Sequence, residues 1–305
     1  GPTGVGKTEV AEQLASRAGG EVVSADSMQV YRGMDIGTAK RPAASRRVPY
    51  HCVDVADPGA TYSAALYQAD ARRAMDDVLA RGGVPVLAGG TGLYVRAAID
   101  DWTFPPGEVA SETRAKLESE AARVGAHAMH ARLAAADPRS AALIHPNNLR
   151  RTLRALEMAE GGVSYAAQAG RFNDRTSVYD AFIVGLDMER AALYAAIDAR
   201  VDAMMVAGLV DEVRGLLARG RRDALTATQA IGYKELVPVV EGGADLVAAV
   251  EDVKRATRRY AKRQLTWFRA DPRVRWLDVT GLSCAEASEA VARLIESAEG
   301  TPAAS

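Results

Sequence analysis

The 305-residue chain is predicted to be an α/β protein, in which a parallel sheet with helices on both faces is interrupted by an all-helical insertion. Three observations predict this. The chain opens on an intact phosphate-binding loop at residues 1–8, and strand patterns then alternate with helix patterns. Between residues 108 and 170, only amphipathic helices and turns are predicted. Together these features indicate a P-loop NTPase-like fold.

The phosphate-binding loop has the spacing G-x-x-x-x-G-K-[ST]. Its glycines let backbone N–H groups surround a phosphate, Lys7 adds positive charge, and the Thr8 hydroxyl can ligate Mg²⁺. A helix predicted over 7–18 would add its N-terminus to the anion site. The motif indicates a di- or triphosphate ligand and leaves open which one, ATP included. Such a loop normally follows a buried strand, and we expect the native first strand to be missing before Gly1. The expected phosphate-binding residues are Gly1, Pro2, Thr3, Gly4, Val5, Gly6, Lys7 and Thr8.

The remaining elements follow in order. In the first part we expect a strand at 21–25, a loop-rich stretch at 35–57 with a possible strand at 51–53, a helix at 63–81 and a strand at 84–88. After the helical segment we expect a strand at 181–186, helices at 189–207, 209–219, 228–241 and 244–269, a strand at 274–279 and a helix at 284–297. The tail at 300–305 is expected to be disordered. The catalytic core is thus assigned to 1–107 and 171–305, and the insertion to 108–170.

Two predicted strands end in residues that can carry chemistry. Asp26 follows the first strand, and Thr91 follows the glycine pair after the third. Ligands bind at the carboxyl ends of strands in open parallel sheets, so both side chains should lie beside the phosphate loop. Asp26 could ligate Mg²⁺ or act as a general base, and its position does not choose between them. The local alternatives are an Asx-turn for Asp26 and a helix N-cap for Thr91.

The charge of the chain is balanced overall and clustered locally. The net charge is −1, which gives no bulk attraction for nucleic acid. Residues 254–275, however, carry nine basic side chains against one acid, Asp271. On a helix, Arg255, Arg258, Arg259, Lys262 and Arg263 would form a continuous basic face. A second cluster is Arg150, Arg151 and Arg154. Both could be ordinary solvated faces, but two such patches on a near-neutral protein favour local phosphate binding.

Other features exclude several classes of protein. No apolar run approaches about 18 residues, so no membrane span is expected. Cys52 and Cys284 match no metal spacing and are expected to be reduced thiols of a cytoplasmic, monomeric protein. His127 and His130 have no further ligand at a suitable spacing and are expected to be solvated.

The motifs resemble the tRNA dimethylallyltransferase family, also called tRNA isopentenyltransferases. The phosphate loop and the stretch from Ser24 to Lys40, SADSMQVYRGMDIGTAK, carry the resemblance most specifically. Further matching stretches, in the same order, are Val53-Asp54, Asp57-Pro58, Tyr62-Ser63-Ala64, Gly89 to Tyr94, His145 to Asn148, Arg151 to Glu157, Gly232 to Glu235 and Arg258 to Arg269. No Cys/His finger follows the last strand, which favours the bacterial type.

The resemblance implies an activity and roles for several residues. The enzyme would transfer a dimethylallyl group from dimethylallyl diphosphate to N6 of adenine 37 in tRNA, by direct attack of N6 on the allylic carbon. Lys7, and Mg²⁺ held by Thr8, would neutralise the diphosphate leaving group. Asp26 would accept the N6 proton, Thr91 would place the adenine or the diphosphate, and Arg200 would bind the diphosphate.

The resemblance also implies the tRNA contacts. The adenine must leave the stacked anticodon loop to reach the allylic carbon. The helical insertion would clasp the anticodon stem-loop, and the basic helix would follow the RNA backbone. The expected tRNA-binding residues are Asp26, Ser27, Met28, Gln29, Thr91, Arg114, Arg150, Arg151, Thr152, Leu153, Arg154, Gln229, Ala230, Ile231, Gly232, Tyr233 and Lys234.

Three other interpretations compete with this one. A P-loop small-molecule kinase using ATP explains only the phosphate loop and the sheet pattern. An isopentenyltransferase acting on free adenine nucleotides leaves the helical insertion and the basic clusters without a use. A non-enzymatic RNA-binding module leaves Asp26 and the phosphate loop unexplained.

Overall fold

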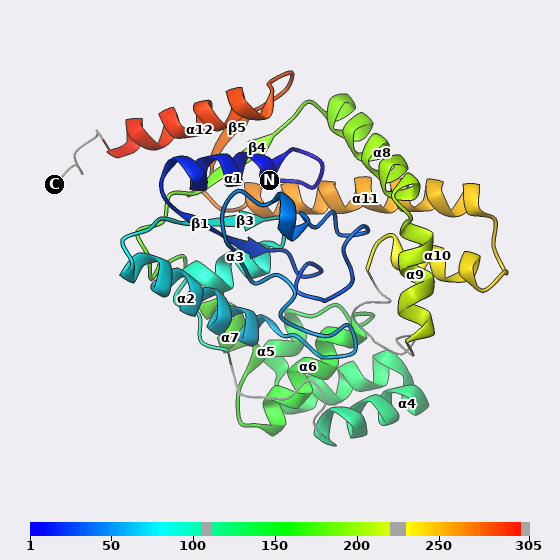
Figure 1. Cartoon of the computed structure of the whole chain (residues 1–305). Helices are drawn as coiled ribbons and strands as arrows, with labels where there is room; N and C mark the ends of the chain where they lie inside the picture. The colour runs from blue at the N-terminus through cyan, green and yellow to red at the C-terminus, as the bar shows by residue number, and fades with distance from the viewer. Residues whose placement is uncertain (105–111, 220–229, 300–305) are drawn as a thin grey trace. The chain divides into compact units, whose positions relative to one another are not determined.

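The structure is a computed structural model that describes residues 1–104, 112–219 and 230–299 (Figure 1). The chain divides into two compact units. The first comprises Gly1–Ala98 and Asp180–Ser305, and the second comprises Ile99–Tyr179.

The strands of the first unit are all parallel to their described neighbours. Strand β1 (Glu21–Ala25) lies between β2 (Tyr50–His51) and β3 (Pro85–Gly89), while β4 (Val184–Asp187) pairs with β5 (Arg275–Asp278). Ala25 is in register with Gly89, so the residues that follow these two strands emerge side by side. This register brings the loops beginning at Asp26 and Gly90 to one edge of the sheet.

Helices cover both faces of this sheet, as predicted. In Figure 1, α1 lies on one side of β1 and β3, and α2 lies on the other. The helices of this unit are α1 (Lys7–Arg17), α2 (Ala64–Ala80), α3 (Gly92–Ile99), α8 (Arg190–Val206), α9 (Leu209–Ala218), α10 (Tyr233–Val240), α11 (Leu246–Arg269) and α12 (Cys284–Glu299), with a 3₁₀ turn, η1, at Ala43–Ser45. The sequence did not predict α3, because its eight residues are too few to show a helical period.

Side-chain caps and an apolar core explain why these helices form where they do. Ser63 accepts a hydrogen bond from the Leu66 N–H, and Asp245 accepts one from the Ala248 N–H, so α2 and α11 begin at the residues that follow them. Each such cap contributes about 1 kcal/mol. A buried cluster packs α1, α8, α11 and α12 around β4 and comprises Val5, Val10, Leu186, Leu193, Ile197, Ala261, Val279, Ala287 and Val291.

The second unit is helical throughout its described elements. They are α4 (Glu112–Ala136), α5 (Pro138–Ala142), α6 (Leu149–Glu160) and α7 (Tyr165–Arg171). Helix α4 is kinked at Gly125, which has a φ of 83°. The core is formed by leucines and methionines on the inward faces of α4 and α6, among them Leu117, Met129, Leu133 and Leu156.

The predicted disordered tail at 300–305 and the expected start of a helix at 228 lie outside the described residues. Among the helices that the structure describes, none combines the length and the apolar character needed to cross a bilayer.

Candidate active site

The phosphate loop has the backbone geometry of an anion site. Gly4 and Gly6 have φ angles of 88° and 84°, in the left-handed region that glycine adopts without strain. The N–H groups of Gly4, Val5 and Gly6 donate no hydrogen bond to any described residue. Helix α1 begins directly after them at Lys7, so its own first N–H groups point the same way. The loop therefore offers a set of unpaired donors to a phosphate group.

Two cations lie at this loop. The half-buried Lys7 ammonium donates to the Pro2 carbonyl at 2.5 Å, and Arg200 Nη1 donates to Thr3 Oγ1 at 3.3 Å. Burial, helped by the charge of Arg200, lowers the pKa of Lys7 to about 7, and the carboxylate of Asp26 opposes that shift. Burial also lowers the pKa of Arg200, again against Asp26. An anionic ligand would relieve this unfavourable clustering of positive charge.

The structure places Asp26 within electrostatic range of both cations. Its Oδ1 accepts hydrogen bonds from the N–H of Met28 at 2.8 Å and of Gln29 at 3.4 Å. This is the Asx-turn that the sequence allowed. Oδ2 accepts no hydrogen bond from the described residues. One carboxylate oxygen thus fixes the side chain, and the other remains available for a proton or a metal ion.

Thr91 connects the end of β3 to the turn after β1. Its N–H donates to the Ala25 carbonyl at 3.1 Å, and its hydroxyl accepts the Ser27 N–H at 3.1 Å. The hydroxyl also lies 3.3 Å from Ser27 Oγ. Thr91 therefore contacts the residues on either side of Asp26. Its hydroxyl contacts Ser27, in the turn after β1, instead of capping α3.

Sequence reasoning missed two residues of α11 that reach the same place. The amide of the buried Gln264 accepts the Thr3 N–H at 2.7 Å and donates to the Gly90 carbonyl at 2.9 Å. Tyr260, one turn earlier, has Thr91 and Gln264 as hydrogen-bonding neighbours; burial first and the charge of Asp26 second raise its pKa to about 12. The only available signal was their place in the Arg258 to Arg269 stretch, which was interpreted through its basic residues alone.

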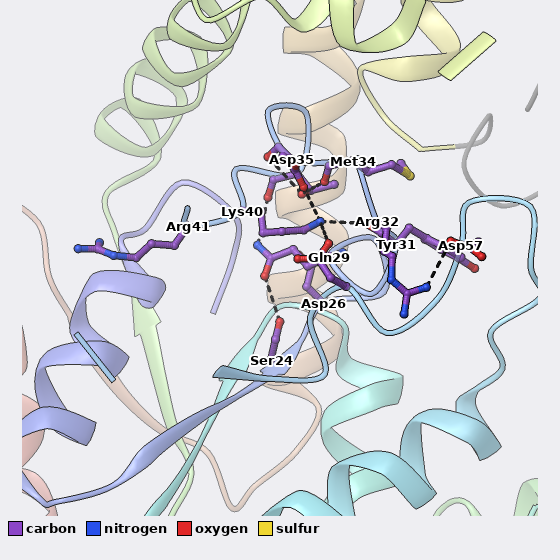
Figure 2. Close-up of polar contacts among 12 residues, drawn as sticks. Ser24, Asp26, Gln29, Tyr31, Arg32, Met34, Asp35, Lys40, Arg41 and Asp57 are labelled. Carbon is purple, nitrogen blue, oxygen red and sulfur yellow. Dashed lines mark hydrogen bonds and ion pairs between the residues drawn. The ribbon is translucent and has the colours of Figure 1, made fainter. Parts of the chain in front are cut away.

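The segment after Asp26 is held by a buried lysine. Figure 2 shows Lys40 at the centre of this segment, where its ammonium contacts the Tyr31 carbonyl at 2.8 Å, Asp35 at 2.7 Å and Asp54 at 2.6 Å. The side chain of Gln29 joins Ser24 Oγ at 3.1 Å to the Thr38 carbonyl at 3.2 Å. These contacts give the long loop a defined shape without regular secondary structure.

Helix α9 grips the same segment through a carboxylate. Glu212 accepts the successive N–H groups of Asp35, Ile36 and Gly37 at 2.9, 2.8 and 3.1 Å. The buried Tyr233 donates its hydroxyl to Glu212 Oε1 at 2.5 Å, and a Cβ on Gly37 would lie 2.5 Å from its ring.

The contacts of Tyr233 with Glu212 and Gly37 change the interpretation of the expected tRNA-binding stretch at 229–234. Gln229 lies outside the described residues, and Ala230 and Tyr233 are buried. Gly232 has a φ of 94° at the start of α10. Tyr233 therefore supports the 35–37 loop, and Lys234, which is exposed and lies 3.5 Å from Glu235, is the residue of this stretch whose charge faces solvent.

The continuous basic face expected on α11 is wrong at two positions. Arg258 is half-buried, pairs with Asp198 of α8 at 2.5 Å and covers the Tyr194 ring. Arg255 pairs with Asp252 on its own helix. The prediction failed because it counted acids only within residues 254–275, whereas Asp252 lies just before that range and Asp198 comes from α8, in a distant part of the chain.

Three cations remain on the exposed face of α11. Arg259, Lys262 and Arg263 are exposed and form no ion pair with the residues that the structure describes. Arg263 lies over the Tyr260 ring at 5.7 Å. The exposed Trp267 follows one turn later and packs against Gly92, where a Cβ would lie 2.0 Å from its ring.

The second unit carries the remaining predicted RNA contacts. Arg150 and Arg151 are exposed, whereas Thr152 and Leu153 are 0% and 4% exposed and face its core. Arg154 pairs with Glu157 at 2.8 Å, and Arg114 pairs with Glu118 at 2.7 Å. The helical period places residues 152 and 153 on the inward face of α6. The arginine side chains of this helix are therefore the ones that stay predicted to contact RNA.

The metal-binding capacity of the site depends on the ligand. The described residues contain no cluster of three or more His, Cys, Asp or Glu side chains suited to a metal ion. The exposed Thr8 hydroxyl makes no hydrogen bond to them. A free hydroxyl such as that of Thr8 is a ligand type that fits Mg²⁺, which proteins commonly hold through one or two side chains together with substrate phosphates and water.

The fold and the site define a class of protein: a P-loop α/β enzyme whose phosphate loop faces a carboxylate and a hydroxyl at the strand ends. Comparison with known proteins narrows the class. The model of the IPP transferase family matches residues 29–271, and that of the isopentenyl transferase family matches residues 1–47. The chain belongs to the IPP transferase family.

Similar proteins cover nearly the whole chain. The tRNA dimethylallyltransferase of Symbiobacterium thermophilum is 50% identical over 97% of this chain and 93% of its own length. That of Bacillus subtilis is 45% identical over 92% and 89%.

Solved structures agree with these sequence comparisons. The full-length tRNA isopentenylpyrophosphate transferase of Bacillus halodurans shares 43% identity with a TM-score of 0.72, covering 97% of this chain and 94% of that one. A eukaryotic dimethylallyltransferase acting on tRNA shares 28% identity with a TM-score of 0.83, covering 99% and 79%. These likenesses confirm the predicted fold class and the resemblance drawn from the motifs.

Proposed function

We propose that this enzyme transfers the dimethylallyl group of dimethylallyl diphosphate to N6 of adenine 37 in tRNA. The observation that carries the proposal is the arrangement at Asp26. One carboxylate oxygen is held in an Asx-turn, the other accepts no hydrogen bond from the described residues, and Lys7 and Arg200 are close enough for its charge to affect their pKa values. A carboxylate that could accept a proton is therefore close to the two cations that would bind the diphosphate.

The donor side of the reaction is the phosphate loop. The unpaired N–H groups of Gly4, Val5 and Gly6 would bind diphosphate oxygens, with Lys7 and Arg200 adding charge. Stabilisation of the departing diphosphate is the main way such a site lowers the barrier to breaking the allylic C–O bond. Bound Mg²⁺, held by Thr8 and the substrate phosphates, would add positive charge at the leaving group.

The acceptor side is the turn after β1. The N6 amine is a poor nucleophile because its lone pair is delocalised into the ring. As the N–C bond forms at the allylic carbon and the C–O bond to diphosphate breaks, the N6 proton would pass to the free oxygen of Asp26. Thr91 and Ser27, joined through the Thr91 hydroxyl, would hold the edge of the extruded base.

The choice of tRNA over smaller acceptors rests on surfaces outside the reaction centre. The exposed Arg259, Lys262 and Arg263 on α11 and the exposed Arg150 and Arg151 on α6 suit RNA phosphates. The names of the relatives also specify tRNA. We propose that the helical unit clasps the anticodon stem-loop. A free adenine nucleotide would use neither surface.

Replacement of Asp26 by Asn tests the assigned base. Asparagine keeps the size and the turn but cannot accept a proton, so the single-turnover rate should fall about 10²-fold or more with both substrates still bound. The rate and both affinities would be measured across a Mg²⁺ titration. Recovery of the rate at high Mg²⁺ would instead make Asp26 a metal ligand.

A substrate comparison with the unaltered protein tests the reaction itself. Labelled dimethylallyl diphosphate and labelled ATP would each be incubated with tRNA and with AMP. Transfer of the allyl label to tRNA is expected. Transfer to AMP alone would assign the enzyme to free nucleotides, and transfer of phosphate from ATP alone would assign it to the kinases.

A further inference from the structure

The amide of Gln264 touches both halves of the active site described above. On the side that would bind dimethylallyl diphosphate, its Oε1 accepts a hydrogen bond from the N–H of Thr3, within the phosphate loop, at 2.7 Å. On the side that would hold the adenine, its Nε2 donates a hydrogen bond to the carbonyl of Gly90, next to Thr91, at 2.9 Å. The side chain is only 6% exposed, so water cannot readily replace either partner.

The Gln264 amide packs closely against the backbone at Gly90. A Cβ on Gly90 would lie 2.1 Å from Gln264 Nε2, closer than any real contact. A side chain at position 90 would therefore displace the amide from its present position, although Gly90 has no left-handed φ angle. An amide can accept a hydrogen bond at its oxygen and donate one at its nitrogen, so this one side chain satisfies both partners.

Gln264 continues into the hydrogen bonds that surround Asp26. Gly90 precedes Thr91, whose hydroxyl accepts the N–H of Ser27, the residue after Asp26. Tyr260, on the same face of α11, has both Thr91 and Gln264 as hydrogen-bonding neighbours. The phosphate loop and the turn that carries Asp26 are thus connected through one side chain of α11.

We propose that Gln264 is a positioning residue that sets the distance between the bound diphosphate and the attacking amine. This inference rests on the proposed function and deepens it. Direct displacement needs the nucleophile and the leaving group in line on either side of one carbon, and a misplacement of about 1 Å can cost about 10²-fold in rate. Each substrate contacts only one side of the bridge, so binding should depend on it far less than the chemical step.

Replacement of Gln264 by Met tests the proposal with the 305-residue chain and tRNA. Met keeps the length of the side chain and removes both hydrogen bonds. We expect the single-turnover rate at saturating substrates to fall about 10²-fold. The dissociation constants for dimethylallyl diphosphate and for tRNA should each change less than about threefold. A parallel loss of diphosphate affinity would show a collapsed phosphate loop instead and would overturn the positioning role.

The matched control is Gln68→Met. Gln68 also donates its amide to a backbone carbonyl, that of Ala97, at 2.9 Å, but on α2 and away from the reaction centre. This variant should keep the rate of the unaltered enzyme within about twofold. Equal rate losses in both variants would mean that any lost amide contact slows the enzyme, and the special role of Gln264 would be wrong.

A double-variant cycle tests the same bridge from the Gly90 side. Gly90→Ala should slow the enzyme through the clash with Nε2, and the same change in a Gln264→Ala background should add little, because the clashing atom is gone. Multiplicative losses would contradict the proposal.

Amide exchange at Thr3, followed by NMR, gives a readout that does not depend on activity. Exchange should be faster in Gln264→Met than in the unaltered protein, and unchanged exchange would remove the bridge itself. If the unaltered enzyme transferred no dimethylallyl group to tRNA, the proposed function would fail, while this exchange measurement would still decide whether Gln264 holds the loop.

Discussion

Glu212 should be among the most sensitive positions away from the reaction centre. Its carboxylate accepts four hydrogen bonds, from the N–H groups of Asp35, Ile36 and Gly37 and from the hydroxyl of Tyr233. Hydrogen bonds to a charged group are worth about 1.5–3 kcal/mol each. Asp35 is exposed and the other two N–H groups are half-buried, so water would recover much of that value when the carboxylate is removed.

We therefore expect Glu212→Ala to lower the free energy of unfolding by about 3 kcal/mol. At about 2–4 °C per kcal/mol, the melting temperature should fall by about 6–12 °C. Glu212→Gln keeps one acceptor oxygen, loses roughly half of the contacts, and should cost about 2 kcal/mol. The matched control is Asp211→Asn, the adjacent exposed residue, whose only described ion pair is with Arg214; it should change stability by less than about 0.5 kcal/mol.

The assay combines thermal melts with amide exchange at residues 35–37. Exchange there should accelerate in both Glu212 variants and not in Asp211→Asn. A cycle with Tyr233→Phe should show coupling, because both side chains share one hydrogen bond. Equal melting temperatures for Glu212→Gln and Asp211→Asn, or unchanged exchange at 35–37, would refute the reasoning.

Two further predictions concern charge. Because the pKa of Lys7 is lowered to about 7, its amine is mostly neutral at pH 8, and a bound diphosphate raises that pKa. Binding of dimethylallyl diphosphate at pH 8 should therefore take up close to one proton, and affinity should fall as the pH rises above 7. Calorimetry in buffers of different ionisation enthalpy measures this, and uptake that persisted in Lys7→Met would contradict it. On α11, reversal of Arg259, Lys262 and Arg263 to Glu should weaken tRNA binding and flatten its salt dependence, whereas Arg293→Glu on α12 should not. Salt slopes that are equal in the two variants would show that the α11 face is merely solvated.

The local patterns of the sequence were sufficient to predict the phosphate loop and most of the helices and strands. Glycine spacing determines which backbone angles the loop can adopt, and periods of 2 and 3.6 residues determine which stretches become strands and helices. Asp26 and Thr91 could be assigned to one edge of the sheet because parallel strands end at the same edge. These inferences depend on residues close together in the chain, or on a rule that holds for every parallel sheet.

Contacts between distant segments were decided only by the tertiary structure. Gln264 meets Thr3 and Gly90 across 261 and 174 positions, and Glu212 meets Gly37 across 175. Arg258, which the sequence assigned to an exposed basic face, is paired with Asp198 because α8 packs against α11. A helical period states which residues share a face, but the packing of the whole chain decides what that face meets. The partners of a buried amide or a clustered cation therefore become known only when the fold is complete.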